Sequence, residues 1–254
     1  VAFQAGPVLP QPLTLLLMCI AAMLAAGLYG VLAAALKVKF GTNETLLTLM
    51  LNYIALYFVS YLQNGPWRDP AANGFPKIAT FADNAVLGKV LGVQAGWLVM
   101  LALVAGVWVY LKYSKQGYEV AVVGESQETA RYAGIKVRRV VLRTMFLSGA
   151  IGGVCGMLQA VGTDATLSTG IAGGVGFTAI IVAWLAQFNT FVMVLISFLL
   201  VFLQKGAIQI ASQFKLNDFA SNVITGIILF CIIGSEFFIQ YKLIFRGRKE
   251  AHHS

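Results

Sequence analysis

The stretch Leu13–Leu36, LTLLLMCIAAMLAAGLYGVLAAAL, decides the fold, because none of its 24 residues is charged. An α-helix needs roughly 20 apolar residues to cross the ~30 Å hydrocarbon core of a bilayer. Of all 254 residues, 59% are hydrophobic and 11% are charged, whereas a soluble domain has about 25% charged residues. The sequence therefore predicts an all-α, polytopic membrane bundle that forms a single transmembrane domain over residues 1–254.

Six further segments have a similar apolar composition. The seven predicted membrane helices span residues 13–36, 46–62, 95–112, 140–161, 174–187, 190–204 and 219–241. The fifth is short and follows a glycine-rich stretch, so we expect it to be broken or re-entrant.

Lys and Arg residues gather after the first, third and seventh apolar segments, which is typical of cytoplasmic ends. With an external N-terminus, seven helices place all three groups on the cytoplasmic side. This predicts an extracellular loop at 63–94, a cytoplasmic loop at 113–139 and a cytoplasmic tail at 242–254.

The net charge of +8 does not indicate nucleic-acid binding, because the cations lie at the ends of membrane segments and form no basic groove with interleaved aromatic residues. Cys19, Cys155 and Cys231 lie inside apolar runs, where we expect buried thiols and neither metal nor redox chemistry. Both histidines lie in the C-terminal tail, so no catalytic Ser–His pair is predicted. We expect no cofactor on this chain.

A polar stripe runs along the second segment. At ~100° per residue, its members share about a third of the helix circumference; they are Thr45, Thr48, Asn52, Ser60 and Gln63. Lipid would leave Asn52 without hydrogen-bond partners, so the stripe faces either a cavity or neighbouring helices. Thr48 and Asn52 are candidate residues of a solute pathway.

The fourth segment has a face of small and polar residues, which are Ser148, Gly149, Gly152, Gly156 and Gln159. Small residues four apart allow two helix backbones to approach closely, so we expect tight packing along this face. Gln159 lies one turn beyond the glycines and is a further candidate for contact with a solute.

The stretch 163–177, TDATLSTGIAGGVGF, has glycines where a helix should begin. It lacks the G-x-G-x-x-G spacing of a nucleotide-binding loop. Unwound backbone at membrane depth occurs only inside protein or beside a water-filled cavity. The segment is therefore either a plain external loop or part of a pathway, with Gly170, Gly173, Gly174 and Phe177 as candidates.

Residues 125–135, ESQETARYAGI, predict a short amphipathic helix on the cytoplasmic side. Ser126 or Glu125 is suited to begin it, and Gly134 is well placed to end it. Such a helix between two membrane spans is either a lever that acts on a soluble partner or a solvated connector.

This segment also carries a family resemblance. Glu128, Ala130 and Gly134 match the E-A-A-x-x-x-G coupling motif of bacterial ABC importer permeases, with Thr129 in place of the first Ala and without the later part of the motif. GYEVAVVGESQETARYAGIKVRRV resembles the permeases that import simple sugars and nucleosides. TNETLLTLMLNYIALYFVSYL, followed by NGPWRDP and GFP, resembles the nucleoside branch of this family. GIAGGVGFTAIIVAWLAQFN resembles the glycine-rich segment and short helix of the same family.

The resemblance covers nearly the whole chain and implies a membrane subunit that couples to an ATPase. The implied coupling residues are Glu125, Glu128, Ala130, Arg131 and Gly134. It also implies a second permease subunit, cytoplasmic ABC ATPase subunits, an extracellular substrate-binding protein and a bacterial plasma-membrane location. Since this chain has no G-x-x-x-x-G-K-[ST] loop, ATP is expected on the partner. Because the first residue is Val1 and the family has further N-terminal helices, we expect an N-terminal part to be missing.

The expected function is ATP-driven import of nucleosides or related ribose-containing solutes. A permease for simple sugars or branched-chain amino acids remains an alternative. An ion-coupled secondary transporter would need intramembrane carboxylates, for which Glu236 is the candidate. We expect both Glu236 and Lys205 to lie near the membrane interface.

Overall fold

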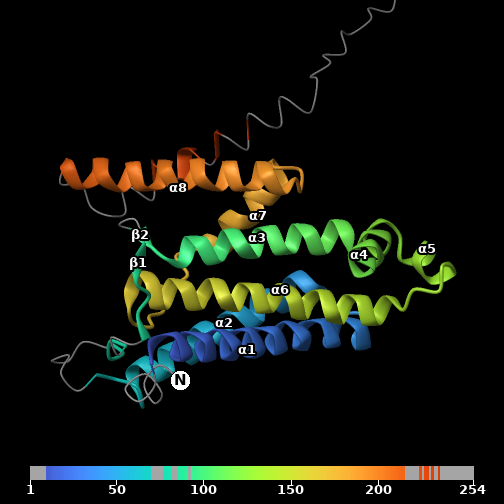
Figure 1. Ribbon diagram of the computed structural model, residues 1–254, viewed down its shortest axis with the longest axis horizontal. Helices are drawn as coiled ribbons and strands as arrows, with labels where there is room; N and C mark the ends of the chain where they lie inside the picture. The colour runs from blue at the N-terminus through green and yellow to red at the C-terminus, as the bar shows by residue number, and fades with distance from the viewer. Residues whose placement is uncertain are drawn as a thin grey trace, which may run out of the picture. The chain divides into compact units, whose positions relative to one another are not determined.

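The computed structural model describes residues 10–69, 77–81, 85–90, 93–214, 223–224, 226–228, 230–231 and 234. Most of these residues are helical (Figure 1), and five of their helices are long and apolar enough to cross a membrane. The predicted all-α, polytopic fold is thus confirmed. The segment 219–241 lies largely outside the described residues, so the count of seven spans stays a prediction. The chain divides into two compact units, Val1–Gly173 and Gly174–Ser254, and the single domain over 1–254 likewise stays a prediction.

Two long helices, α1 (Gln11–Phe40) and α2 (Glu44–Asn64), begin the first unit. Gly41 ends α1 with a left-handed backbone, and its N–H donates to the carbonyl of Lys37. Asn43 begins α2, because its side chain accepts hydrogen bonds from the first backbone N–H groups of that helix. An ion pair between Lys37 and Glu44 joins the two helix ends.

The core of the first unit is the contact between α1 and α6 (Val137–Gln159), which run antiparallel. A side-chain carbon at Gly149 would lie 2.5 Å from the carbonyl oxygen of Ala26, and one at Gly153 would lie 2.4 Å from that of Ala22. The backbones are therefore in direct contact. The predicted tight packing of this helix is confirmed, but not its predicted face.

The packing face predicted for this helix is wrong beyond Gly149. A side-chain carbon at Gly152 or Gly156 would meet nothing within 4 Å, and both residues are exposed, as are Ser148 and Gln159. Gly153, four residues after Gly149, packs against α1 instead because Ala22 and Ala26 provide the matching close approach.

The segment after α2 covers the ends of α1 and α6. A π-helical turn, η2 (Ala160–Asp164), extends α6, and the Val161 carbonyl accepts a hydrogen bond from the Leu87 N–H at 3.3 Å. The Thr166 hydroxyl donates to the carbonyl of buried Ile78 at 2.9 Å. A two-stranded antiparallel hairpin, β1 (Lys89–Val90) and β2 (Val93–Gln94), ends the segment. The described part of loop 63–94 is thus ordered.

Three helices link this segment to α6: α3 (Gly96–Tyr113), α4 (Lys115–Glu125) and α5 (Gln127–Tyr132). Ser114 lies between α3 and α4 and accepts a hydrogen bond from the Gly117 N–H at 3.0 Å. At Gly117, a side-chain carbon would lie 2.1 Å from the carbonyl oxygen of Leu111. Only glycine therefore fits this bend.

The second unit contains α7 (Val175–Leu185) and α8 (Thr190–Gln213). With 11 residues, α7 is about 16 Å long and is shorter than the ~30 Å core of a bilayer, as the prediction of a short or broken helix required. A turn with positive φ at Gln187 and Phe188 leads into α8. The predicted end of α8 at residue 204 is wrong, so Lys205 lies within the helix and not after it.

Candidate coupling site and solute pathway

Helix α5 is short, and both of its ends are fixed by specific residues. The Ser126 hydroxyl accepts a hydrogen bond from the Thr129 N–H at 3.3 Å, which confirms Ser126 as the residue that begins the helix. At the other end, the Ile135 N–H donates to the carbonyl of Ala130 at 2.9 Å and the Gly134 N–H to that of Arg131 at 3.0 Å. This pair of bonds requires a left-handed residue, and Gly134 has a φ of 77°.

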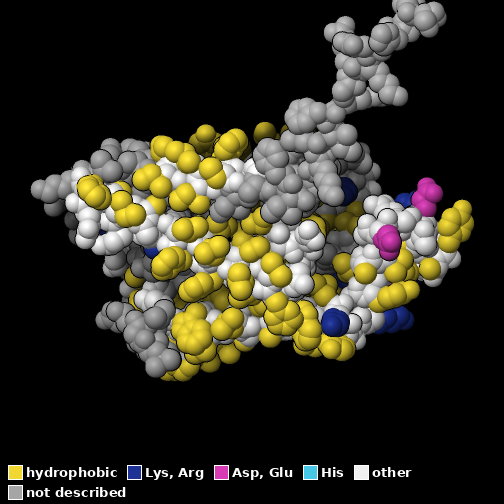
Figure 2. Space-filling view, turned by 90° about the horizontal axis from the view of Figure 1, so that it is seen from above, with side chains coloured by type: hydrophobic (Ala, Val, Ile, Leu, Met, Phe, Trp, Pro, Cys, Tyr) yellow, Lys and Arg dark blue, Asp and Glu magenta, His cyan; other side chains and the backbone are white. Residues whose placement is uncertain are grey.

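The sides of α5 differ sharply in exposure. Ala130 is completely buried, whereas Glu128 and Arg131 are exposed, as is Glu125 at the end of α4. Charged side chains gather at the end of the molecule in view where α4 and α5 lie (Figure 2), while hydrophobic side chains are numerous over the rest of this face. The structure therefore brings all five predicted coupling residues into one segment with a charged outer surface.

An ion pair connects α4 and α6. The Arg143 Nη2 donates to the Glu119 Oε2 at 3.2 Å and to the carbonyl of Gln116 at 3.4 Å. Both charged side chains are 25% exposed, so solvent screens the pair only in part. A charged contact thus joins α4 to α6, which belongs to the helices long and apolar enough to cross a membrane.

Neither α4 nor this ion pair was predicted from the sequence. One short helix was predicted over residues 125–135, whereas a separate helix precedes it from Lys115 to Glu125. Ser114 followed by eleven residues without proline was an available signal for that helix start. The partner of Glu119 lies 24 residues away on another helix, and no local pattern indicates it.

The predicted pathway residues do not form one cluster. Thr48 and Asn52 are exposed on α2, a helix without buried residues that contacts α1. The Thr48 hydroxyl donates to the Glu44 carbonyl at 2.9 Å. Gln159 is exposed in the last turn of α6. Their part in transport stays a prediction.

The glycine-rich segment is irregular, as predicted. Gly170–Gly174 form turns, and Gly173 and Gly174 have φ values of 49° and 75°. Gly170 and Gly173 end the first unit, and Gly174 and exposed Phe177 belong to the second. The choice between an external loop and a pathway lining remains open.

A cavity of about 310 Å³ lies in the first unit between α1, α6 and the segment that covers their ends. Most of its lining is aliphatic, with aromatic side chains from Trp67 and Phe81. Gly156 and Ala160 form part of its α6 wall. Such a surface suits a flat apolar group better than a charged one.

Known proteins resemble this chain along most of its length. The family model described as branched-chain amino acid transport system / permease component matches residues 2–233. The glucose ABC transporter permease protein of Haloferax volcanii is 30% identical, with 92% of this chain and 65% of that protein covered.

The guanosine ABC transporter permease protein of Bacillus subtilis is 29% identical, over 92% of this chain and 68% of its own length. The nucleoside ABC transporter permease protein of Lactococcus lactis is 25% identical, over 93% and 68% respectively. This chain thus spans about two thirds of the length of these relatives. No solved structure matches it significantly.

The family match extends from residue 2 to 233 and so includes the coupling segment, every described membrane helix and the glycine-rich stretch. The similar proteins are transporter subunits and not enzymes. The chain therefore belongs to the permease-component family of the branched-chain amino acid transport systems, whose members include ABC transporter permeases for sugars and nucleosides.

Proposed function

We propose that this chain is the transmembrane permease subunit of an ATP-driven importer of nucleosides or related ribose-containing solutes. The similarity to the guanosine and nucleoside permeases supports this substrate class. The aromatic residues Trp67 and Phe81 in the 310 Å³ cavity fit a solute with a flat base. Thr48, Asn52 and Gln159 would supply hydrogen bonds to an uncharged, hydroxyl-rich solute.

The single observation that carries the ATP-driven mechanism is the capped helix α5 with its exposed charges. It projects from α4, and the Arg143–Glu119 contact ties α4 to the membrane-spanning helix α6. A cytoplasmic ATPase that binds ATP and holds α5 would move α6 through this contact. A second permease subunit would complete the path, and an extracellular binding protein would deliver the solute.

We also propose an orientation in the bacterial plasma membrane, which the placement of Lys and Arg after the first, third and seventh apolar segments supports. The coupling loop 113–139 and the tail 242–254 lie on the cytoplasmic side, and the loop 63–94 lies outside. Single cysteines at Asn73 and Gln127, in a full-length protein without its native cysteines, would be labelled from opposite sides by an impermeant thiol reagent. Labelling from the same side would contradict the orientation.

Uptake into vesicles that contain the whole complex tests the function. Radiolabelled guanosine should accumulate only when ATP is present on the ATPase side. Uptake that a proton or sodium gradient drives equally well without ATP would instead support a secondary transporter.

Variants of α5 test the coupling step. Gly134→Val places a branched side chain at a left-handed position, and Glu128→Lys reverses an exposed charge. Both variants should insert normally but lose uptake and transport-coupled ATP hydrolysis together. Gly134→Asn is the matched control, because asparagine tolerates this conformation. Normal uptake and normal ATPase co-purification in both variants would reduce α5 to a solvated connector.

Sugar import is the second candidate, because the glucose permease of Haloferax volcanii is 30% identical to this chain. Competition distinguishes the two substrate classes. Unlabelled nucleosides should abolish guanosine uptake, whereas glucose at the same concentration should not. Glucose uptake that nucleosides leave unchanged would favour the sugar permease.

A further inference from the structure

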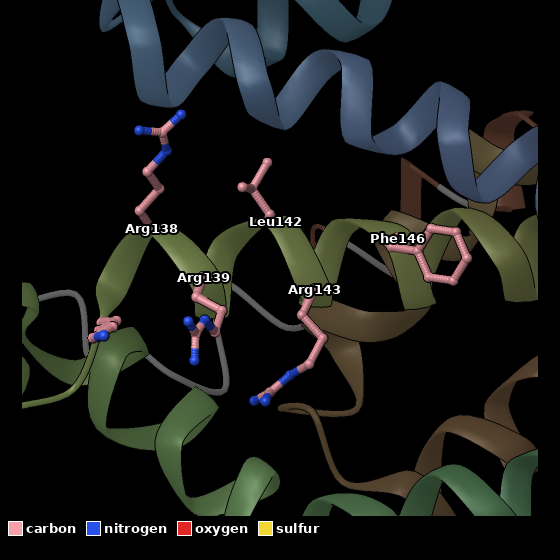
Figure 3. Close-up of a pocket in the computed structure, with 6 residues that line it drawn as sticks. Arg138, Arg139, Leu142, Arg143 and Phe146 are labelled. Atoms are coloured by element: carbon pink, nitrogen blue, oxygen red, sulfur yellow. The ribbon is translucent and has the colours of Figure 1, made fainter.

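A basic pocket of about 540 Å³ lies at the start of α6, on the surface of the first unit. Its lining comes entirely from that helix and the residue before it: Lys136, Arg138, Arg139, Leu142, Arg143 and Phe146. Figure 3 shows Arg138, Leu142 and Phe146 on the side of α6 that faces α1, and Arg139 and Arg143 on the other side. The pocket thus combines four cationic side chains with two apolar ones.

The positive charge of this pocket is only partly compensated. Glu119 from α4 pairs with Arg143, and no carboxylate is among the lining residues. The first turn of α6 contains no acidic residue, and no side chain caps it. The N-terminal end of a helix has a partial positive charge and attracts anions. Helix α1 runs antiparallel to α6 with Gly30 against Met145, and this register brings Lys37 toward Arg138. The charge of Lys37 is compensated by its ion pair with Glu44.

One donor in the pocket is still available to a ligand. The Nε of Arg143 is buried and has no hydrogen-bond partner within the described part of the chain. Burial of a polar group without such a bond is unfavourable. An anionic oxygen that reached this Nε would supply the missing acceptor.

The depth of the pocket places it at the membrane surface. The apolar helix that begins at Val137 extends over 26 residues, which is about 39 Å, longer than the ~30 Å hydrocarbon core. A helix of this length that spans a bilayer can hold its charged first turn at the level of the lipid headgroups. Leu142 and Phe146 follow one and two turns further into the membrane, and the Phe146 ring packs closely against Gly27 of α1.

We propose that this pocket binds an anionic phospholipid. The guanidinium group of Arg138 holds the phosphate on the side of α6 that faces α1, where an acyl chain lies along Leu142 and Phe146, and Arg139 on the other side of the helix adds its positive charge at the level of the headgroup. Guanidinium groups suit phosphate because their planar donors match its oxygens. A free phosphate ion or an acidic protein surface would use the cations but would leave the apolar wall in contact with water, which favours a lipid.

Lipid affinity, measured on the full-length permease in complex with its partner subunits, tests this site. Phosphatidylglycerol is titrated into detergent-solubilised, delipidated protein, and bound lipid is counted by native mass spectrometry. Arg138→Gln/Arg139→Gln should weaken phosphatidylglycerol binding about 25-fold, because each basic residue contributes a factor of about five near an anionic surface. Phosphatidylcholine should bind both proteins weakly and equally.

The matched control is Lys112→Gln/Lys115→Gln. It removes two positive charges near the same end of the first unit, outside the pocket, and its phosphatidylglycerol affinity should stay within about twofold, since screening limits distant charges. Equal losses in both double variants would mean a general charge effect and would overturn the site. Displacement of the lipid by excess inorganic phosphate would show that the pocket binds free anions instead.

A charge-preserving variant tests the site even if the glutamine double variant does not fold. Arg138→Lys/Arg139→Lys should keep selectivity for phosphatidylglycerol over phosphatidylcholine, with a modest loss of affinity. On the unaltered protein, phosphatidylglycerol binding should also fall steeply with salt. Equal affinity of the unaltered protein for the two lipids would by itself contradict the proposal.

Discussion

The contact between α1 and α6 differs in kind from the surfaces of α2 and α3. Along the first, glycine and alanine bring two backbones together, and the buried residues are small or β-branched, such as Ala33, Ala34, Ala150 and Val154. In contrast, α2 and α3 have no buried residue. Large apolar side chains such as Tyr57, Phe58 and Leu101 are exposed there.

This difference reflects what drives helix association in a membrane. Lipid tails are as apolar as leucine, so burial of apolar surface does not by itself bring two helices together. Close packing of small residues does, and α1 and α6 have those residues at a spacing of four. The surfaces of α2 and α3 are of the kind that lipid or another membrane subunit covers.

The largest effect should come from a change in the α1–α6 contact. In Gly153→Val, the side chain would meet the Ala22 carbonyl oxygen and the Ala26 side chain, and we expect a loss of about 3 kcal/mol in stability. The matched control is Gly152→Val, where nothing lies within 4 Å. Thermal unfolding in detergent should show a lower midpoint for Gly153→Val only; equal midpoints would refute the close contact.

A second pair of variants extends the comparison to the bend between α3 and α4. Gly117→Ala would place a carbon against the Leu111 carbonyl oxygen, and about 2 kcal/mol should be lost. Gly124→Ala in the same helix has open space and should instead stabilise by up to about 1 kcal/mol through its helix propensity. Resistance of the 113–139 loop to protease measures both changes in stability. A change in the same direction for both variants would contradict the close contact at this bend.

A smaller effect is expected where α4 meets α6 through charges. Either Arg143→Leu or Glu119→Leu should cost about 1–2 kcal/mol, because each leaves a partly buried charge without its partner. The double variant should cost less than the sum of the two single changes. Additive losses in a double-mutant cycle would show that the two residues do not interact.

The smallest effect on stability should come from the exposed surface of α2. Asn52→Leu changes a side chain that is exposed on a helix without buried residues. The free energy of unfolding should therefore change by less than about 0.5 kcal/mol. Guanosine uptake should nevertheless fall if Asn52 contacts the solute. Unchanged uptake with unchanged stability would remove Asn52 from the pathway and leave the transporter class intact.

Local signals in the sequence determined much of the fold and of the coupling site. Apolar length alone located the helices that begin near Leu13, Leu46 and Thr190. Ser126 was one of two residues predicted to begin α5, and Gly134 was predicted to end it, because each end depends on bonds within six residues. The resemblance predicted the family, which the match over residues 2–233 confirmed. The coupling role of the segment at α5 stays a prediction.

Only the tertiary structure decided which glycines pack and which charges pair. The fourth apolar segment contains two glycine pairs with the same spacing, Gly149–Gly153 and Gly152–Gly156, and the sequence of that segment gives no reason to prefer either. Ala22 and Ala26 on α1 select the first pair. The Arg143–Glu119 bond likewise exists only because the bend at Gly117 turns α4 back toward α6. Composition and caps act within a few residues of one helix, whereas a packing face is chosen by the helix that lies against it.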